Sequence, residues 1–123
     1  MATRRVGDAG ASGGAGRAGA AELARLRRRI DALDRRIVKL LNERAELARG
    51  VGRVKAVAGR RAIRDVDRER EILLRVAMEN VGPMPVADLL ALYRKVFAST
   101  RALEAADRRR AATERAATEP GND

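Results

Sequence analysis

The sequence predicts an all-α chain of three helices, the first of them long enough to need a second copy of the chain as its packing partner. Two observations carry this prediction. Apolar residues recur three and four positions apart over most of the chain, which is the spacing of one face of an α-helix. The long first segment of this pattern contains no proline, so nothing in it forces a break.

The first helix is expected from about residue 22 to residue 58. Its apolar positions hold the three-and-four pattern across several heptads: Leu23, Leu26, Ile30, Leu33, Ile37, Leu40, Leu47, Val51 and Val54. Gly50 and Gly52 weaken the helix by roughly 1 kcal/mol each relative to alanine, but the register continues through them. Gly59 is the expected stop signal.

Two shorter helices follow. One is expected over about residues 64–80, with Val66, Leu73 and Val76 on one face. Gly82, Pro83 and Pro85 predict the turn after it. The last helix begins at about Val86, and its apolar face is made of Leu89, Leu92, Tyr93, Val96 and Leu103.

The length of the first helix predicts an assembly. Residues 22–58 would form a helix ~55 Å long at 1.5 Å per residue. The two shorter helices cannot cover an apolar stripe of that length. The remaining stripe needs another chain, most simply a second copy related by a two-fold axis. We therefore expect an obligate homodimer.

One folded domain is expected between two tails. Residues 1–20 are rich in glycine and alanine without periodicity, which predicts a disordered arm. Residues 21–106 form the helical domain, and residues 107–123 lack an apolar face, which predicts a frayed or disordered tail. No signal peptide and no apolar run of bilayer length is found, so we expect a cytoplasmic protein without membrane contact.

The composition excludes several kinds of catalysis. The chain has no cysteine and no histidine, which removes thiolate nucleophiles, the commonest general base and the commonest transition-metal ligand. The formal charge of +10 suits an anionic partner, or it is the charge of ordinary solvated helix faces. An enzyme of this composition must act through positioning and charge.

Each helix carries a polar residue where its apolar seam calls for an apolar one: Arg44 in the first, Glu69 in the second and Thr100 in the third. Burying an unpaired charge costs several kcal/mol, so such residues pair or face a polar cavity. One interpretation is a buried Arg44–Glu69 ion pair that fixes the register. The other is a charged pocket with a wall from each helix.

The neighbouring residues favour the pocket. Lys55 lies 11 residues after Arg44, about 20° away around the helix, so the two cations share a face. Asp65 and Glu69 share a face at a spacing of four, with Arg68 beside them, and Thr100 and Glu104 form a similar pair. A site of this kind, with excess positive charge, carboxylates and a hydroxyl, suits a small polyanion that carries hydroxyl groups.

Residues 26–104 resemble the all-helical class of chorismate mutases. The motifs are Leu-Arg-x-x-Ile-Asp at 26–31, Leu-Asp at 33–34, Leu-Leu-x-Glu-Arg at 40–44, residues 52–55, Arg-Asp-x-Asp-Arg-Glu-Arg at 64–70 and Thr-x-x-Leu-Glu at 100–104. The run at 64–70 is the most specific of these. The resemblance implies an isomerase of aromatic amino-acid biosynthesis that converts chorismate to prephenate without a cofactor or a metal.

The resemblance also implies an intertwined helical-bundle homodimer and a role for each polar residue. Arg27 would reach the site of the second copy, where it and Arg44 would clamp the two substrate carboxylates. Arg44, Lys55 and Glu104 would be the catalytic residues, with Lys55 and Glu104 at the ether oxygen. The remaining substrate-binding residues would be Asp65, Arg68, Glu69 and Thr100. Because the reaction is an intramolecular [3,3] rearrangement, it needs no proton transfer and no external nucleophile.

Residue 104 departs from the family pattern, which often has glutamine there. An ionised Glu104 would repel the negative charge that develops on the ether oxygen, so we expect activity to rise as the pH falls below neutral. Two rival functions stay open: an isochorismate-pyruvate lyase on the same fold, and a basic helical protein that binds nucleic acid, although no recognised nucleic-acid motif is present. A regulatory partner enzyme is a further candidate partner.

Overall fold

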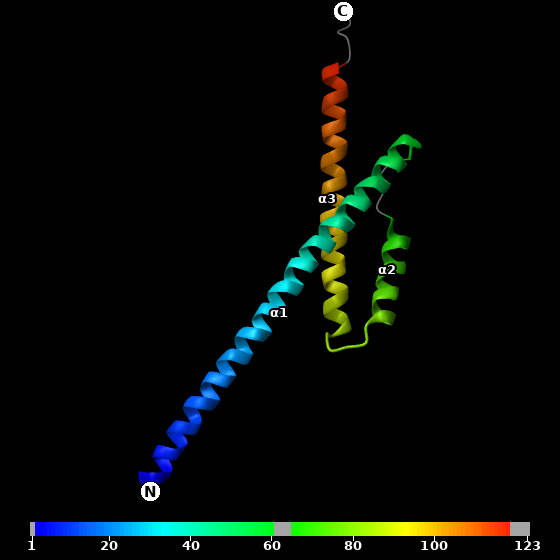
Figure 1. The fold of residues 1–123 in the computed structure, drawn as a ribbon. Helices are drawn as coiled ribbons and strands as arrows, with labels where there is room; N and C mark the ends of the chain where they lie inside the picture. The colour runs from blue at the N-terminus through cyan, green and yellow to red at the C-terminus, as the bar shows by residue number, and fades with distance from the viewer. Residues whose placement is uncertain (1, 61–64, 119–123) are drawn as a thin grey trace, which may run out of the picture. The chain divides into compact units, whose positions relative to one another are not determined.

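The computed structural model describes residues 2–60 and 65–118, with side chains from residue 13 onward. These ranges hold three α-helices and no strand: α1 (Ala2–Val57), α2 (Val66–Glu79) and α3 (Val86–Thr118) (Figure 1). The prediction of an all-α chain with a long first helix is confirmed.

The chain separates into two compact units, one through Leu40 and the other from Leu41. The first unit is the N-terminal part of α1. From residue 13 onward, where side chains are described, its large apolar side chains are exposed, from 42% for Leu26 to 58% for Val38. They include the stripe that the sequence predicts: Leu23, Leu26, Ile30, Leu33, Ile37 and Leu40. This stripe therefore has no cover in a single chain.

Both terminal segments differ from the prediction of a disordered arm and a frayed tail. Helix α1 begins at Ala2, and α3 continues past residue 107 to Thr118. Extending a helix that has already formed adds a hydrogen bond per residue without a new nucleation step, and both segments are rich in alanine, the strongest helix former. The absence of an apolar pattern in the sequence indicates that a segment does not pack against another, and it does not exclude a helix. In agreement with this, no atom lies within 4 Å of a Cβ built on Gly13 or Gly16.

The C-terminal end of α1 is closed by a Schellman motif. Gly59 has a φ of +73°, a left-handed conformation that glycine adopts without steric cost. The Gly59 N–H donates to the Ala56 carbonyl at 3.0 Å, and the Arg60 N–H donates to the Lys55 carbonyl at 2.9 Å. The expected stop at Gly59 is confirmed, and Lys55 lies in the last turn of the helix.

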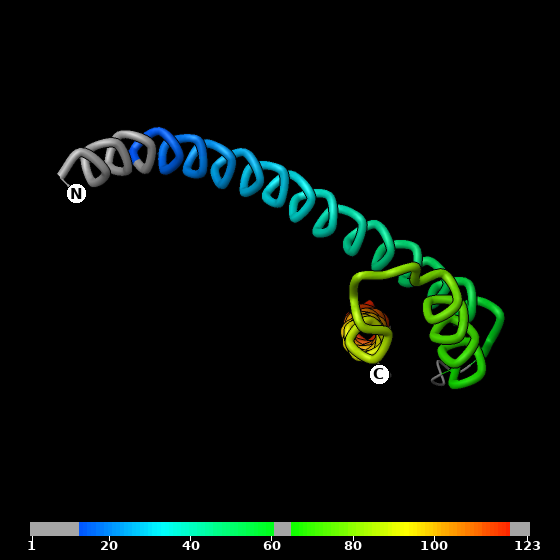
Figure 2. The backbone as a smooth tube through the Cα atoms, turned by 90° about the horizontal axis from the view of Figure 1, so that it is seen from below, coloured from blue at the N-terminus to red at the C-terminus, as the bar shows by residue number. Residues whose placement is uncertain are grey.

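Helices α2 and α3 lie side by side and run antiparallel (Figures 1 and 2). Asp65 caps the N-terminus of α2, so this helix begins two residues after position 64, which lies outside the described residues. In the turn between the helices, the Asn80 Nδ2 donates to the Met84 carbonyl at 2.9 Å. The Pro85 carbonyl then accepts from the Asp88 and Leu89 N–H groups at the start of α3.

The second unit also contains residues 41–57 of α1, which contact α3. Among the side chains whose exposure is described, Phe97 of α3 is the buried one, at 5%. The Tyr93 ring meets it edge-on, with ring centroids 6.1 Å apart and planes at 67°. The small core of this unit is therefore centred on α3, and the candidate site is built around it.

Candidate functional site

A cavity of about 390 Å³ is lined by all three helices of the second unit. This volume falls within the range of ~300–1,000 Å³ typical of small-molecule sites. The lining residues are Arg44, Leu47, Ala48, Val51 and Lys55 of α1; Asp65, Arg68, Glu69 and Ile72 at α2; and Phe97, Thr100, Arg101, Glu104 and Arg108 of α3. The cavity brings together seven of the eight predicted site residues.

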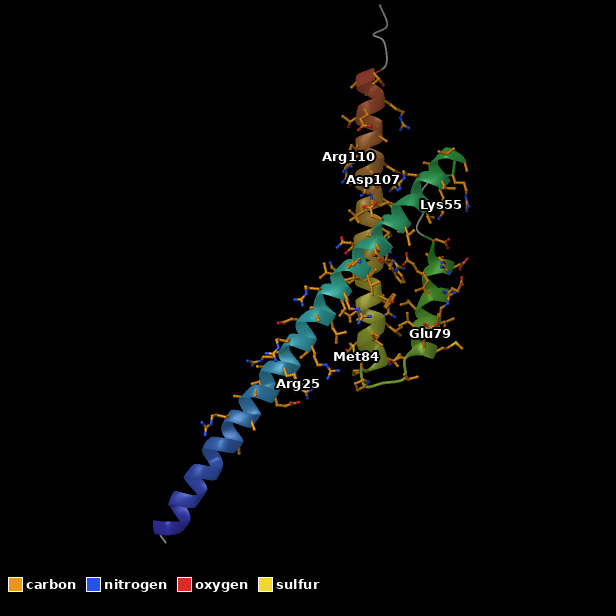
Figure 3. The ribbon with its side chains drawn as sticks, viewed as in Figure 1. Arg25, Lys55, Glu79, Met84, Asp107 and Arg110 are labelled. Atoms are coloured by element: carbon orange, nitrogen blue, oxygen red, sulfur yellow. The ribbon has the colours of Figure 1, made fainter. Side chains whose placement is uncertain are left out.

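The wall from α1 supplies two cations. The Arg44 guanidinium lies over the Phe97 ring, with its carbon 5.5 Å from the ring centroid. This cation–π contact holds the guanidinium at the cavity without neutralising its charge. Lys55 is half-buried, three turns further along the same helix, where Figure 3 labels it. The two cations are thus on one wall, as the sequence predicts.

Asp65 and Arg68 stand at the start of α2. The Asp65 Oδ1 accepts from the Arg68 backbone N–H at 2.9 Å, which is the bond of a helix N-cap. The Arg68 side chain donates to the Glu71 Oε1 at 3.0 Å along the exposed face of the helix. Both residues line the cavity, but Asp65 also has a structural role that accounts for an aspartate at this position.

Glu69 is a largely covered carboxylate of the cavity, with 16% of its side chain exposed. Its Oε2 accepts from the Arg101 Nη1 of α3 at 2.7 Å. One of the two interpretations of the sequence paired this carboxylate with Arg44, and the other placed both residues at a charged pocket. The structure gives Glu69 the partner Arg101 and places the Arg44 guanidinium over the Phe97 ring. An ion pair therefore joins α2 to α3 at the cavity wall.

Helix α3 contributes a hydroxyl and a further carboxylate. The Thr100 Oγ1 donates to the Val96 carbonyl one turn earlier, at 3.0 Å, so its oxygen lone pairs remain the part that can accept from a ligand. Glu104 packs on Gly52 of α1: a Cβ built on Gly52 would lie 3.5 Å from the Glu104 Cγ and 3.9 Å from its Oε1. The space that a side chain at residue 52 would occupy thus borders this carboxyl group.

Two cations of the cavity, Arg101 and Arg108, are missing from the sequence prediction. The sequence spacing could have indicated Arg108, because Thr100, Glu104 and Arg108 recur every four residues and so share a face of α3. The predicted end of the ordered helix near residue 106 excluded Arg108. With both included, the lining holds five cations against three carboxylates, a balance that suits an anionic ligand.

Arg27 is not part of this cavity. It belongs to the first unit, where its side chain is exposed on α1.

An ion pair outside the cavity joins α1 to α3. The Arg49 Nε and Nη2 donate to Asp107 Oδ2 and Oδ1, both at 2.9 Å, and the Arg49 Nη1 also donates to the Glu46 Oε1 at 2.8 Å. Asp107 lies on α3 where Figure 3 labels it. The hydrogen bonds that Arg49 donates hold the pKa of the Asp107 carboxyl below its ordinary value, and donating them to Asp107 and Glu46 raises the pKa of Arg49.

Within the described ranges, no group of three or more carboxylates is arranged to hold a metal ion. The helices of the same ranges include none with the length and apolar character needed to cross a membrane.

Comparisons with known proteins agree with this geometry. The family model described as chorismate mutase type II matches residues 26–105. The bifunctional chorismate mutase/prephenate dehydratases of Stutzerimonas stutzeri and Aquifex aeolicus are 39% and 38% identical over 83 residues, which is 64% of this chain and 23% of each relative. The chain thus spans about a quarter of the length of these relatives.

A solved structure, chorismate mutase form II from Thermus thermophilus, is 32% identical and superposes with a TM-score of 0.64. The match covers 68% of this chain and 93% of that one. Because both the family model and this structure match most of the helical domain, the chain belongs to the chorismate mutase type II family.

Proposed function

We propose that this chain catalyses the rearrangement of chorismate to prephenate, a step of aromatic amino-acid biosynthesis, without a cofactor. The observation that carries the proposal is the cavity lined by Arg44, Lys55, Glu69 and Glu104 in a chain of the chorismate mutase type II family. The substrate is a dianion with a ring hydroxyl, and the excess of cations over carboxylates in the lining suits it.

Substrate binding is assigned to the cations. Arg44, held over Phe97 at 5.5 Å, presents its guanidinium N–H groups to a carboxylate, for which a planar fork of donors is the best match. Arg68 and the Thr100 lone pairs complete this side of the cavity. Glu69, oriented by Arg101, accepts from the ring hydroxyl, and Asp65 supports it by fixing the start of α2.

Catalysis is assigned to positioning and charge. The cavity holds the flexible enolpyruvyl group over the ring, which replaces a search over conformations by one reactive geometry. As the C–O bond breaks, negative charge develops on the ether oxygen, and the Lys55 ammonium stabilises it. Glu104 faces the same oxygen and helps only when its carboxyl group is protonated and can donate a hydrogen bond.

We further propose a homodimer in which Arg27 completes the site of the second copy. The support is the exposed apolar stripe of the first unit, in which Ile30, Leu33 and Ile37 are each 50% exposed or more. Soluble proteins rarely leave a continuous stripe of this kind uncovered. A second copy related by a two-fold axis would cover it with the same stripe.

A partner enzyme that modulates the activity remains a prediction. The curated relatives are bifunctional chorismate mutase/prephenate dehydratases. A prephenate dehydratase from the same source is therefore the first partner to test, by adding it to the mutase and measuring the rate of chorismate loss.

The experiment that tests the function is the loss of chorismate absorbance with purified protein, with products separated by chromatography. We expect prephenate from the native chain and a loss of about 100-fold in kcat/KM for Arg44→Ala, as for removal of a charged group that holds the reacting molecule. Arg75→Ala is the matched control, since Arg75 is exposed and pairs with Glu71 outside the cavity.

Other outcomes identify the rival functions. Release of pyruvate from isochorismate without turnover of chorismate would replace the mutase with a lyase. If neither chorismate nor isochorismate is turned over, and the affinity for DNA falls steeply as the salt concentration rises, the nucleic-acid-binding function would be favoured.

A further inference from the structure

The Arg49–Asp107 ion pair joins α1 to α3. It is bidentate, with both N–O distances at 2.9 Å, and about a quarter of each side chain is exposed (26% and 24%). Two parallel hydrogen bonds from a planar guanidinium fix orientation as well as distance. Arg110 approaches the same carboxylate at 3.7 Å from the next turn of α3. The pair therefore sets both the spacing and the angle of the helices where it lies.

The pair lies one helical turn from Gly52 on α1 and one turn from Glu104, which lines the cavity, on α3. Residues three apart lie on the same face of a helix. A Cβ built on Gly52 would lie 3.5 Å from the Glu104 Cγ, so the Glu104 side chain lies near residue 52, one turn from the ion pair. A change in the ion pair would therefore first change the position of Glu104 relative to α1.

Apolar packing adds little to the same crossing within one chain. Leu47 and Val51, on either side of Arg49, are 75% and 54% exposed, and Leu103 is 39% exposed. An ion pair of two quarter-exposed groups contributes modestly to stability. Its geometric effect is larger here because few other contacts fix the local position of α3 against α1.

We infer that Arg49 and Asp107 are positioning residues for the proposed mutase reaction, because their ion pair holds the Glu104 carboxyl group against Gly52 at the reacting end of the cavity. The inference rests on the proposed function. Neither side chain lines the cavity, so neither touches the substrate; both act through the placement of Glu104. If the Glu104 carboxyl group is displaced, the rate of the chemical step should fall. The affinity for the substrate should change less, because substrate binding is assigned to the cations of the cavity.

The test compares Asp107→Asn, Arg49→Ala and the charge swap Arg49→Asp with Asp107→Arg in the full chain. Asp107→Asn keeps the shape and removes the charge. We expect each single substitution to lower kcat about 10-fold with a change in KM of less than about 2-fold, and the swap to recover to within about 3-fold of the native kcat. Glu22→Gln removes an exposed ion pair with Arg25 and serves as the control with unchanged kinetics.

A double-mutant cycle separates positioning from general stability. In a Glu104→Ala background, Asp107→Asn should cost less than about 2-fold in kcat, because the group that the pair positions is already gone. Circular dichroism at the assay temperature establishes that every variant is folded. If a single variant unfolds, the milder Arg49→Lys is measured in its place and should keep part of the rate.

Each outcome has one meaning. A folded Asp107→Asn with native kcat overturns the inference, as does an equal loss of kcat with and without Glu104. A native chain that turns over no chorismate overturns the proposed function, and the inference is overturned with it. A native chain that is active while the single variants are also fully active leaves the function intact and removes only the positioning role.

Discussion

Glu104 is the residue whose charge matters most for the proposed chemistry. Its side chain lies on Gly52 at a cavity wall that also carries Lys55. A carboxylate there would oppose the charge that develops on the ether oxygen, whereas a protonated carboxyl group or an amide would donate to it. The chemical group at residue 104 is therefore expected to affect the rate of the proposed reaction.

We predict that Glu104→Gln raises kcat at pH 7.5 about 10-fold, because the amide donates a hydrogen bond to the ether oxygen whereas a carboxylate cannot. The measurement is kcat for both chains at pH 7.5. Glu114→Gln, on the exposed end of α3, is the control. An unchanged kcat would contradict the prediction.

Phe97 supports both the small core and the Arg44 guanidinium. Replacing it by leucine keeps most of the apolar volume but removes the ring face under the cation, a contact of about 0.5–2 kcal/mol. We predict that Phe97→Leu raises KM for chorismate several-fold with a smaller effect on kcat, measured by initial rates. An unchanged KM would show that Arg44 is held in place without the ring.

At the scale of the helix, the C-terminal end of α1 depends on one backbone conformation. Gly59 has a φ of +73° and donates to the Ala56 carbonyl. A Cβ at this φ is strained by roughly 1–2 kcal/mol, so we predict that Gly59→Ala lowers the free energy of unfolding by about that amount. Gly50→Ala should instead raise it by about 0.5–1 kcal/mol, because residue 50 is helical and a Cβ there would meet only the Arg53 side chain, at 3.7 Å. Urea unfolding of both variants measures the difference.

The Asp107 pKa makes the α1–α3 contact dependent on pH. Arg49 lowers the folded-state pKa of this carboxyl group below its ordinary value of 3.8. A lowered pKa means that the stabilisation is fully present above the unfolded-state pKa and is lost as the pH falls through the folded-state pKa. We predict that the stability advantage of the native chain over Asp107→Asn is constant from pH 7 to about pH 5 and shrinks below about pH 4. Urea unfolding at pH 7, 5 and 3 checks it; a constant difference at all three would contradict it.

The sequence predicted the helices well, and it named many of the residues that the structure gathers around the cavity. Periodicity located α2 and α3, and polar residues in the apolar seams located Arg44, Glu69 and Thr100, because a charge in a seam needs a partner or a cavity. The partner of Glu69 was not predictable, since Arg101 meets it only once α2 and α3 pack together. Helix α3 continues beyond residue 106, which the sequence pattern did not predict. An apolar face indicates where a helix packs, whereas a helix without such a face can still form its backbone hydrogen bonds.

At the scale of the whole molecule, the proposed dimer shares its sites between two chains. We predict that Arg27→Ala and Arg44→Ala homodimers are each nearly inactive, and that an equal mixture, unfolded and refolded together, regains about a quarter of the native activity. In the refolded mixture, half of all dimers pair one chain of each variant. Each of these dimers has two sites, and one of the two keeps both arginines, so a quarter of all sites are intact. Activity that stays at the level of the separate variants would mean that Arg27 acts within its own chain or not at all.

Among the described side chains only Phe97 is buried, and this has a consequence for how the protein persists in solution. In the proposed dimer, a chain that encloses so little apolar surface on its own would gain most of its stability from association, so folding and assembly would form one equilibrium governed by mass action. Dilution would then favour the unfolded chain. The midpoint of thermal unfolding should rise with protein concentration, and the rate per chain should fall as the enzyme is diluted towards the dissociation constant of the dimer.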